Sequence, residues 1–313
     1  MEQIESEEKR ARISVVIPTK NRIADLKECI SSLMNQSILI NELIIVDGSD
    51  RDDIKKYIRS LKKPFKVKYI KQMKGGNAHA RNIGIKFSSG DIIIFIDDDV
   101  ILDKDCIRHL ISVFIKDNEN KIGGVGGKTE ELNEDKPYKI ILNLLYRIFG
   151  IIFLRDHLKG GKVTIAGHHS HLPDESGYVE WLGGTCMAYR KECLAKYNDD
   201  ERLERLGTYA YYEDFDLSYR ISRNYKLFLN SQAKLIHKVS PSSRLDPFKT
   251  NSIKIQNHYY LVKKHGFSRV AFWWSTLGLI LAHIIMFLLK PSKTNYDALL
   301  GIIDGIKKII THR

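Results

Sequence analysis

Three adjacent aspartates, Asp97, Asp98 and Asp99, follow directly on the apolar run DIIIFI at 91–96. At an effective dielectric constant near 20, two carboxylates about 4 Å apart repel each other by roughly 4 kcal/mol. A fold that holds them together must therefore neutralise them, and a divalent cation does so directly. Oxygen ligands favour Mg²⁺ or Mn²⁺, ions that usually also bind substrate phosphates. The alternative interpretation is a solvated acidic turn after a strand.

The local backbone decides which of these aspartates share a site. Alternate side chains of an extended backbone point to opposite faces. We therefore expect Asp97 and Asp99 to face one site and Asp98 to point elsewhere.

Apolar strands that alternate with helical patterns must position these residues. ISVVI at 13–17, ELIIVD at 42–47, KVKYI at 66–70 and DIIIFI predict four strands. Between successive strands, the sequence predicts a helix. This alternation favours an α/β fold with parallel strands, and continuous apolar strands are typical of a sheet covered on both faces.

The carboxyl ends of parallel strands meet at one edge of the sheet, which is where α/β proteins bind ligands. Pro18, Thr19, Asp47 and the aspartates at 97–99 all follow or end a predicted strand. We expect them to lie together at that edge.

The second half of the chain predicts fewer regular elements. YVEWLGGTCMAYR at 178–190 predicts a strand, a glycine turn and a strand, EDFDLSYRI at 213–221 predicts a helix, and 226–238 closes the sheet. GHHSH at 167–171 lacks the second ligand pair of a zinc site and predicts a flexible loop. IGGVGGK at 122–128 lacks the following helix and acid of a dinucleotide fingerprint.

The composition indicates which kinds of partner and which cellular compartment to expect. The 313 residues carry a formal net charge of +12, which favours anionic partners such as nucleotide phosphates, nucleic acid or a membrane surface. Cys29, Cys106, Cys186 and Cys193 form no CxxC pair and predict free thiols in a reducing compartment. The charged start of the sequence has no apolar signal segment, so we expect the first half in the cytosol.

One stretch near the end of the sequence is long and apolar enough for a membrane helix. Residues 270–290 reach the roughly 20 apolar residues that a bilayer requires, although Trp, Ser, Thr and His within them also fit a buried or interfacial helix. The basic, amphipathic tail after 297 predicts an interfacial helix.

Six motifs in order resemble those of family-2 glycosyltransferases with the GT-A fold. They are VVIPTKNR, IIVDGSD, NAHARNIGI, FIDDDV, WLGGTCMAYR and EDFDLSYR. The resemblance covers 12–240, and the downstream part, with GIIDG in the tail, is similar to the rhamnosyltransferase-like branch. It implies a mostly parallel, Rossmann-like sheet flanked by helices. The expected organisation is an N-terminal tail at 1–11, a GT-A domain at 12–240, and a helical, membrane-associated region at 241–313.

The resemblance also implies a role for each matching residue. Pro18, Thr19, Asp47, Arg81, Asp97 and Asp98 would bind the nucleotide sugar, with Asp47 at the base and Arg81 near the diphosphate. Asp99 would be the main metal ligand, His237 would complete the metal site, and the ion would be Mg²⁺ or Mn²⁺. Asp214 would be the general base, and Trp181, Gly183, Gly184 and Glu213 would shape the acceptor side.

Several of these residues have simpler interpretations. Asp47 fits a helix cap, and Arg81 fits a surface position on its helix. Glu213 and Asp214 fit an acidic first turn facing a helix dipole. His237 and Trp181 fit structural positions.

The leading hypothesis is an inverting, metal-dependent glycosyltransferase at the cytoplasmic face of the membrane. Its donor would be a UDP- or dTDP-sugar, and its acceptor a glycan, lipid-linked saccharide or polyprenyl phosphate. A nucleotidyltransferase would also use strand-end aspartates, but a Gly-rich basic loop after the first strand is missing. The third hypothesis is a non-catalytic membrane- or nucleic-acid-binding protein of the same fold, and the sequence contains no nucleic-acid recognition module.

Overall fold

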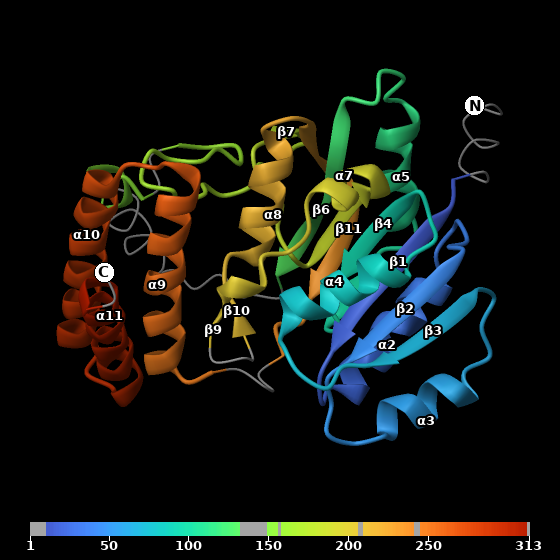
Figure 1. The fold of residues 1–313 in the computed structure, drawn as a ribbon, viewed down its shortest axis with the longest axis horizontal. Helices are drawn as coiled ribbons and strands as arrows, with labels where there is room; N and C mark the ends of the chain where they lie inside the picture. The colour runs from blue at the N-terminus through green and yellow to red at the C-terminus, as the bar shows by residue number, and fades with distance from the viewer. Residues whose placement is uncertain (1–10, 132–148, 156–157, 206–208, 241–244, 312–313) are drawn as a thin grey trace. The chain divides into compact units, whose positions relative to one another are not determined.

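The computed structural model describes residues 11–131, 149–155, 158–205, 209–240 and 245–311. These residues form two compact units. The first comprises Met1–Asn133 with Pro173–Ser243, and the second comprises Glu134–Leu172 with Arg244–Arg313. A sheet with flanking helices builds the first unit, and long helices build the second (Figure 1).

Four parallel strands form the N-terminal half of the sheet, in the order β3-β2-β1-β4. Their register brings Thr19 beside Asp47 at the carboxyl ends of β1 and β2. The predicted strands at 13–17, 42–47, 66–70 and 91–96 are thereby confirmed within one or two residues. The bounds are β1 Ile13–Thr19, β2 Glu42–Asp47, β3 Lys66–Lys71 and β4 Ile92–Ile96.

The second half of the sheet is mixed in direction. Strand β8 runs antiparallel to both β4 and β6, while β6 and β11 are parallel. The short strands β5 and β7 pair antiparallel with β11. The bounds are β5 Val100–Leu102, β6 Ile122–Glu131, β7 Gly177–Val179, β8 Cys186–Arg190 and β11 Lys226–His237.

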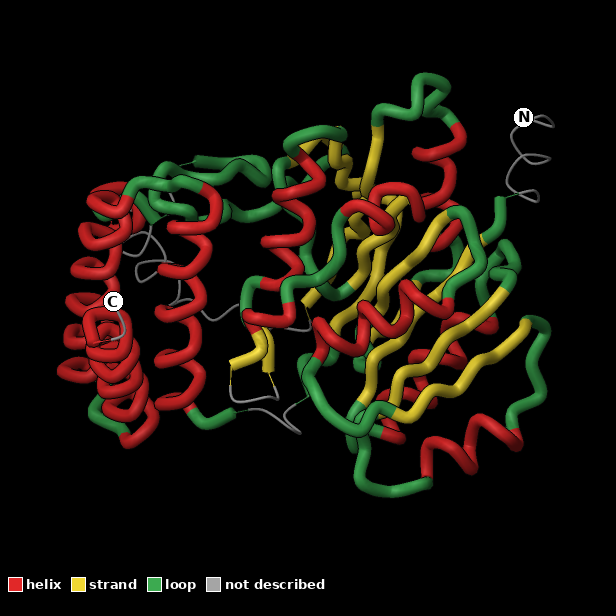
Figure 2. The backbone as a smooth tube through the Cα atoms, viewed as in Figure 1, coloured by secondary structure: helices red, strands yellow, loops and turns green. Residues whose placement is uncertain are grey.

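Helices cover both faces of the sheet (Figure 2). Helices α2 (Ile23–Met34), α3 (Asp53–Ser60) and α5 (Cys106–Ile115) share one apolar core with the sheet. Helices α4 (Asn77–Phe87) and α8 (Glu213–Ser222) pack against the sheet through β1, β2, β6 and β11. Two sheltered faces explain why all six residues of β2 are buried.

Short elements between β8 and α8 complete the first unit. Helix α7 (Lys191–Lys196) follows β8, and a 3₁₀ turn at Glu201–Leu203 leads into the hairpin of β9 (Glu204–Arg205) and β10 (Tyr209–Ala210).

The glycine-rich segment IGGVGGK is the start of strand β6, so it takes no part in a dinucleotide loop. Close neighbours explain its composition. A Cβ on Gly124 would come within 2.6 Å of the Tyr189 ring, and one on Gly127 within 2.8 Å of the Ala233 carbonyl oxygen. Sequence patterns did not predict this strand because glycine lacks the apolar side chains that mark one.

Three helices build most of the second unit: α9 (Pro247–His265), α10 (Arg269–Leu289) and α11 (Lys293–Thr311). Gly301 and Gly305 of α11 lie against α9, where a Cβ would come within 2.2 Å of Phe248 O and 2.1 Å of Ile255 Cγ2. The glycines of GIIDG therefore serve close helix packing within this unit.

The histidine-rich segment at 167–171 packs within the second unit instead of forming an isolated loop. His168 Nε2 lies 3.0 Å from Ser275 Oγ of α10, and His258 Nε2 of α9 lies 2.8 Å from Ala166 O. Burial lowers the pKa of His258 to about 3, so its imidazole is neutral.

Candidate active site

A turn, and not an extended backbone, follows β4 at Asp98 and Asp99. The prediction of an extended segment is wrong, but the side chains still separate. Asp98 accepts hydrogen bonds from Thr19 Oγ1 at 2.7 Å and Arg22 Nη1 at 3.1 Å. Burial raises the pKa of Asp98 to about 7, although Arg22 and Thr19 oppose that shift. Both Asp98 oxygens are thus used within the protein.

Asp97, Asp99 and His237 converge from the ends of β4 and β11. Their ligand atoms all lie within 4.8 Å of one another. His237 Nε2 is 3.1 Å from Asp99 Oδ1, and the Ser240 amide donates to Asp99 Oδ2 at 2.9 Å. Burial alone would raise the pKa of Asp99, but His237 and Ser240 bring it below its usual value.

Arg81 is buried, so its interpretation as a surface arginine is wrong. Its side chain is 1% exposed and reaches from α4 to the carboxyl end of β4. Nη2 lies 3.5 Å from Asp97 Oδ1, and Nη1 lies 3.4 Å from Glu213 Oε1. Burial opposes the charged form, but Asp199, Glu213 and Asp97 outweigh it and raise the pKa of Arg81.

The backbone of Gly184 links Arg81 to Asp214 at the start of α8. Its amide donates to Asp214 Oδ2 at 2.8 Å, and its carbonyl accepts from Arg81 Nη2 at 3.3 Å. A Cβ on Gly184 would come within 3.0 Å of Asp214 and 3.1 Å of Arg81. This close approach explains why a glycine stands before β8.

Glu213 and Asp214 begin α8 but differ in environment. Glu213 is 8% exposed, while Asp214 is only partly buried. Burial and the neighbouring Asp214 raise the pKa of Glu213 to about 7, against the opposing charge of Arg81. Because Arg81 and Asn77 already engage the Glu213 carboxylate, Asp214 is the more accessible of the two acids.

Asp47 ends β2 with both carboxylate oxygens bonded. Oδ2 accepts from Tyr69 OH at 2.7 Å, and Oδ1 accepts from the Ser49 amide at 2.8 Å. Its carboxylate does not cap α3, whose N-cap residue is Asp52. The burial of Tyr69 and its bond to Asp47 raise the pKa of the phenol.

Sequence analysis missed several residues that hold the site together. Arg22 and Tyr69 bond two of the predicted acids, and Thr185 O accepts from the Asp97 amide at 3.2 Å. Asp199 is 2% exposed and neighbours Arg81. Arg22 lies inside VVIPTKNR, so the motif offered a signal for it. Asp199 lies outside every motif.

The remaining predicted positions lie in the sheet or in the segment before β8. Pro18 pairs with Val46 between β1 and β2. Trp181 and Gly183 lie between β7 and β8, and both are partly buried.

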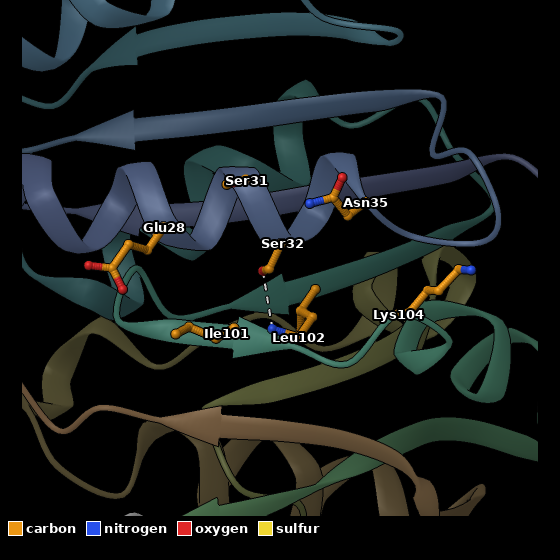
Figure 3. A pocket seen from close by; sticks show the side chains of 7 residues that line it. All are labelled: Glu28, Ser31, Ser32, Asn35, Ile101, Leu102 and Lys104. Atoms are coloured by element: carbon orange, nitrogen blue, oxygen red, sulfur yellow. Dashed lines mark hydrogen bonds between the residues drawn. The ribbon is translucent and has the colours of Figure 1, made fainter.

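A surface hollow between α2 and β5 is separate from this site (Figure 3). Glu28, Ser32 and Leu102 are among its lining residues, and the Leu102 amide donates to Ser32 Oγ at 3.1 Å. None of the predicted site residues lines it.

The family model for glycosyl transferase family 2 matches residues 14–175, more than half of the chain. The chain belongs to glycosyl transferase family 2. The mixed sheet with flanking helices is the GT-A fold of its solved relatives, which confirms the predicted fold class.

Individual relatives of this glycosyl transferase are distant. A GalNAc(5)-diNAcBac-PP-undecaprenol beta-1,3-glucosyltransferase of Campylobacter jejuni is 35% identical over 94 residues, 28% of this chain and 29% of that protein. The chain spans only 13% to 29% of the length of the curated relatives that it matches first. The rhamnosyltransferase-like branch stays a prediction.

Two solved structures share the fold over nearly the whole chain. A mannosyltransferase of Pyrobaculum calidifontis, solved with GDP-Man and Mn²⁺, has a TM-score of 0.60 and 13% identity, covering 97% of this chain and 88% of its own. TarS residues 1–349 of S. aureus, solved with UDP-GlcNAc, has a TM-score of 0.55 and 16% identity, covering 95% and 81%.

The residues of this transferase fit a divalent cation. Two carboxylates and one imidazole offer ligand atoms within 4.8 Å of one another, and two neighbouring carboxylates repel each other unless a cation lies between them. An imidazole suits Mn²⁺ better than Mg²⁺, which prefers oxygen ligands and retains several waters.

Proposed function

We propose that this protein is a metal-dependent, inverting glycosyltransferase. It would move a sugar from a nucleotide-diphosphate sugar to a hydroxyl or phosphate acceptor. The observation that carries the proposal is the convergence of Asp97, Asp99 and His237 beside Arg81, with Gly184 bonded to both Arg81 and Asp214.

Two positive charges would face the leaving diphosphate on the donor side of the site. A cation held by Asp99, His237 and Asp97 would neutralise charge on the leaving phosphate. Arg81 would add a second positive charge that is already positioned, because its side chain is buried and fixed by Asp97, Glu213 and Gly184. Asp47, Pro18 and Thr19 would line the nucleoside pocket, and Asp98 would support it by holding Thr19 and Arg22.

Asp214 would accept the proton of the acceptor as it attacks. The hydrogen bonds from the Gly184 and Phe215 amides fix the direction of its carboxylate, and a positioned carboxylate is a suitable general base. A single displacement of this kind inverts the anomeric centre. Glu213, Trp181 and Gly183 would shape the acceptor side.

The acceptor would be a lipid-linked saccharide, a polyprenyl phosphate or a surface glycan at the cytoplasmic face of the membrane. The undecaprenol-linked substrate in the name of the Campylobacter relative supports this class of acceptor. Four buried free thiols support a reducing compartment. The donor would be a UDP- or dTDP-sugar. Because the Pyrobaculum protein was solved with GDP-Man, GDP-sugars are tested as well.

The first experiment measures binding and hydrolysis of a panel of UDP-, dTDP- and GDP-sugars with Mn²⁺, Mg²⁺ or EDTA. We expect one donor to bind in a metal-dependent manner and Asp99→Ala to lose that binding. Asp174→Ala is the matched control, since the side chain of Asp174 is 98% exposed. Failure of every donor to bind, with or without metal, would leave only the fold in common with transferases.

A further inference from the structure

Helix α10 exposes a continuous apolar stripe. Its members recur at helical steps of three and four, so they lie on one side of the helix. Val270 is 81% exposed and Leu288 is 70% exposed, unusual values for large apolar residues. We call this set the outward stripe: Val270, Trp274, Leu277, Leu281, Ile284, Ile285, Leu288 and Leu289.

The opposite side of α10 is fixed within the second unit. Phe272, Ser275 and Thr276 are buried, and Phe272 belongs to the apolar core shared with α9 and α11. Phe153 packs so closely on Gly278 that a Cβ there would come within 2.2 Å of its ring. The Trp274 indole donates to Ile152 O at 2.8 Å, so exposed Ile151 and Ile152 extend the outward stripe.

The chain segment that contains the outward stripe carries charge of one sign. Residues 247–296 contain no aspartate or glutamate but seven lysines and arginines: Lys249, Lys254, Lys263, Lys264, Arg269, Lys290 and Lys293. Lys263 and Arg269 are exposed at one end of α10, and Lys290 and Lys293 at the other. Bases at both ends of an apolar stripe complement an anionic lipid surface.

By length and composition, α10 is the one helix of the described residues that could cross a membrane. Its neighbours argue against that arrangement. The Ser268 amide donates to Ile165 O at 2.9 Å, and His168 bonds Ser275 about two turns further along. A bilayer around α10 would therefore have to hold this non-helical backbone, part of which is exposed, since Ile165 is 60% exposed. Hydrocarbon does not tolerate exposed non-helical backbone.

We propose that α10 is a monotopic anchor that lies in the plane of an anionic membrane surface, with the outward stripe in the lipid and its buried side still on α9 and α11. The proposal deepens the membrane attachment in the proposed function. It also exchanges two roles that the sequence suggested. The tail helix α11 uses its small and apolar residues on α9, and the spanning candidate α10 becomes the interfacial helix.

Depth measurement along α10 tests the geometry. The four native cysteines are all buried, so single Val270→Cys, Leu281→Cys and Leu288→Cys variants accept a spin label selectively. Residues 270 and 288 lie about 27 Å apart along a helix axis. In vesicles containing phosphatidylglycerol, we expect the three labels to report the same depth. A depth that changes steadily from 270 to 288 would overturn the proposal in favour of a spanning helix.

Vesicle flotation of the 313-residue chain tests the surface itself. We expect binding to phosphatidylglycerol vesicles that weakens with salt, and a loss of at least ~10-fold in Leu288→Glu. Leu39→Glu is the matched control, because Leu39 is 66% exposed in the other unit. Equal loss in both variants, or no binding by the unchanged chain, would overturn the proposal. Self-association that Leu288→Glu abolishes, without vesicle binding, would assign the stripe to a second copy instead.

These outcomes are independent of the transferase proposal. Donor binding is measured without vesicles and depends on Asp99, which lies in the first unit. Loss of vesicle binding with donor binding intact would reject the anchor alone.

Discussion

The acids at the carboxyl edge of the sheet fall into two groups that differ in how the protein bonds them. Asp47 at the end of β2 and Asp98 after β4 each accept a 2.7 Å hydrogen bond from a hydroxyl group and a second bond at the other oxygen. The other group comprises Asp97, Asp99 and Asp214, and its members contact backbone amides or other titratable groups of the site. Asp214 accepts from the Gly184 and Phe215 amides, and Asp99 accepts from the Ser240 amide and lies 3.1 Å from His237 Nε2. Within the described part of the chain, the Asp97 carboxylate contacts Arg81 at 3.5 Å.

This difference separates structural acids from functional ones. Hydrogen bonds from hydroxyl and guanidinium side chains of the sheet and its flanking helix hold a carboxylate as part of the fold. A carboxylate that mainly faces other titratable groups, as Asp97 and Asp99 do, leaves charge for a ligand to compensate. We therefore expect substitutions in the first group to lower stability and substitutions in the second group to lower binding or turnover.

The largest effect is expected from Asp99→Asn. The substitution removes the charge that His237 and Ser240 orient, and we predict a loss of about 10³-fold in kcat/KM together with the metal dependence of donor binding. Isothermal titration with Mn²⁺ and donor would measure both. Unchanged affinity for Mn²⁺ would remove Asp99 from the metal site.

Asp214→Asn should act on turnover alone. We predict a fall of about 10²- to 10⁴-fold in kcat with donor affinity within about threefold, because Asp214 bonds backbone amides rather than the metal cluster. Steady-state kinetics beside equilibrium donor binding would separate the two. Equal loss of donor binding would show that Asp214 organises the donor side.

Glu42, at the start of β2, is a further acid whose bonds we assign to the fold, and its pKa predicts how stability changes with pH. Burial opposes its charge, but Lys68, Ser14 and Ser89 lower its pKa from 4.5 to about 2. A lowered pKa in the folded state stabilises the protein above pH 4.5, and that stabilisation is lost as the pH falls toward 2. We predict a loss of about 3 kcal/mol over this window. Denaturant melts at several pH values should show it for the unchanged chain and much less for Glu42→Gln.

The smallest effect is expected from a comparison of substitutions at the adjacent residues Asp97 and Asp98. Asp98→Asn weakens the bonds to Thr19 and Arg22 and should lower the free energy of unfolding by about 1–2 kcal/mol. Asp97→Asn should leave stability nearly unchanged and weaken donor binding instead. Denaturant unfolding of both variants measures the contrast. If both lose stability equally, the division into two groups fails.

The periodicity of apolar residues predicted the helices and strands that have a strong local sequence pattern. The first four strands and the helices between them follow from apolar runs and turn residues, and their order placed Thr19, Asp47 and Asp97 at one edge. The unpredicted elements have weak local signals. Strand β6 is rich in glycine, and its glycines are explained only by Tyr189 and Ala233, which arrive later in the chain.

The sequence predicted which residues belong to the site but not how they are bonded to one another. Motifs singled out Arg81 and Asp214, yet the burial of Arg81 depends on Glu213, 132 residues away. Tyr69 pairs with Ile45 across β2 and β3, which puts its hydroxyl beside Asp47, and strand spacing would have found it. At the turn, the Asp98 side chain accepts from Thr19 and Arg22, which lie 76 to 79 residues earlier in the sequence.

Gly184 contacts the Arg81 side of the site through its carbonyl and the Asp214 side through its amide. These two groups belong to consecutive peptide planes that meet at the Gly184 Cα, and a Cβ on that atom would come within 3.0 Å of Asp214 and 3.1 Å of Arg81. Any larger residue at this position would therefore disturb the donor side and the acceptor side together, so a change in the preference for either substrate would have to arise in the surrounding loops.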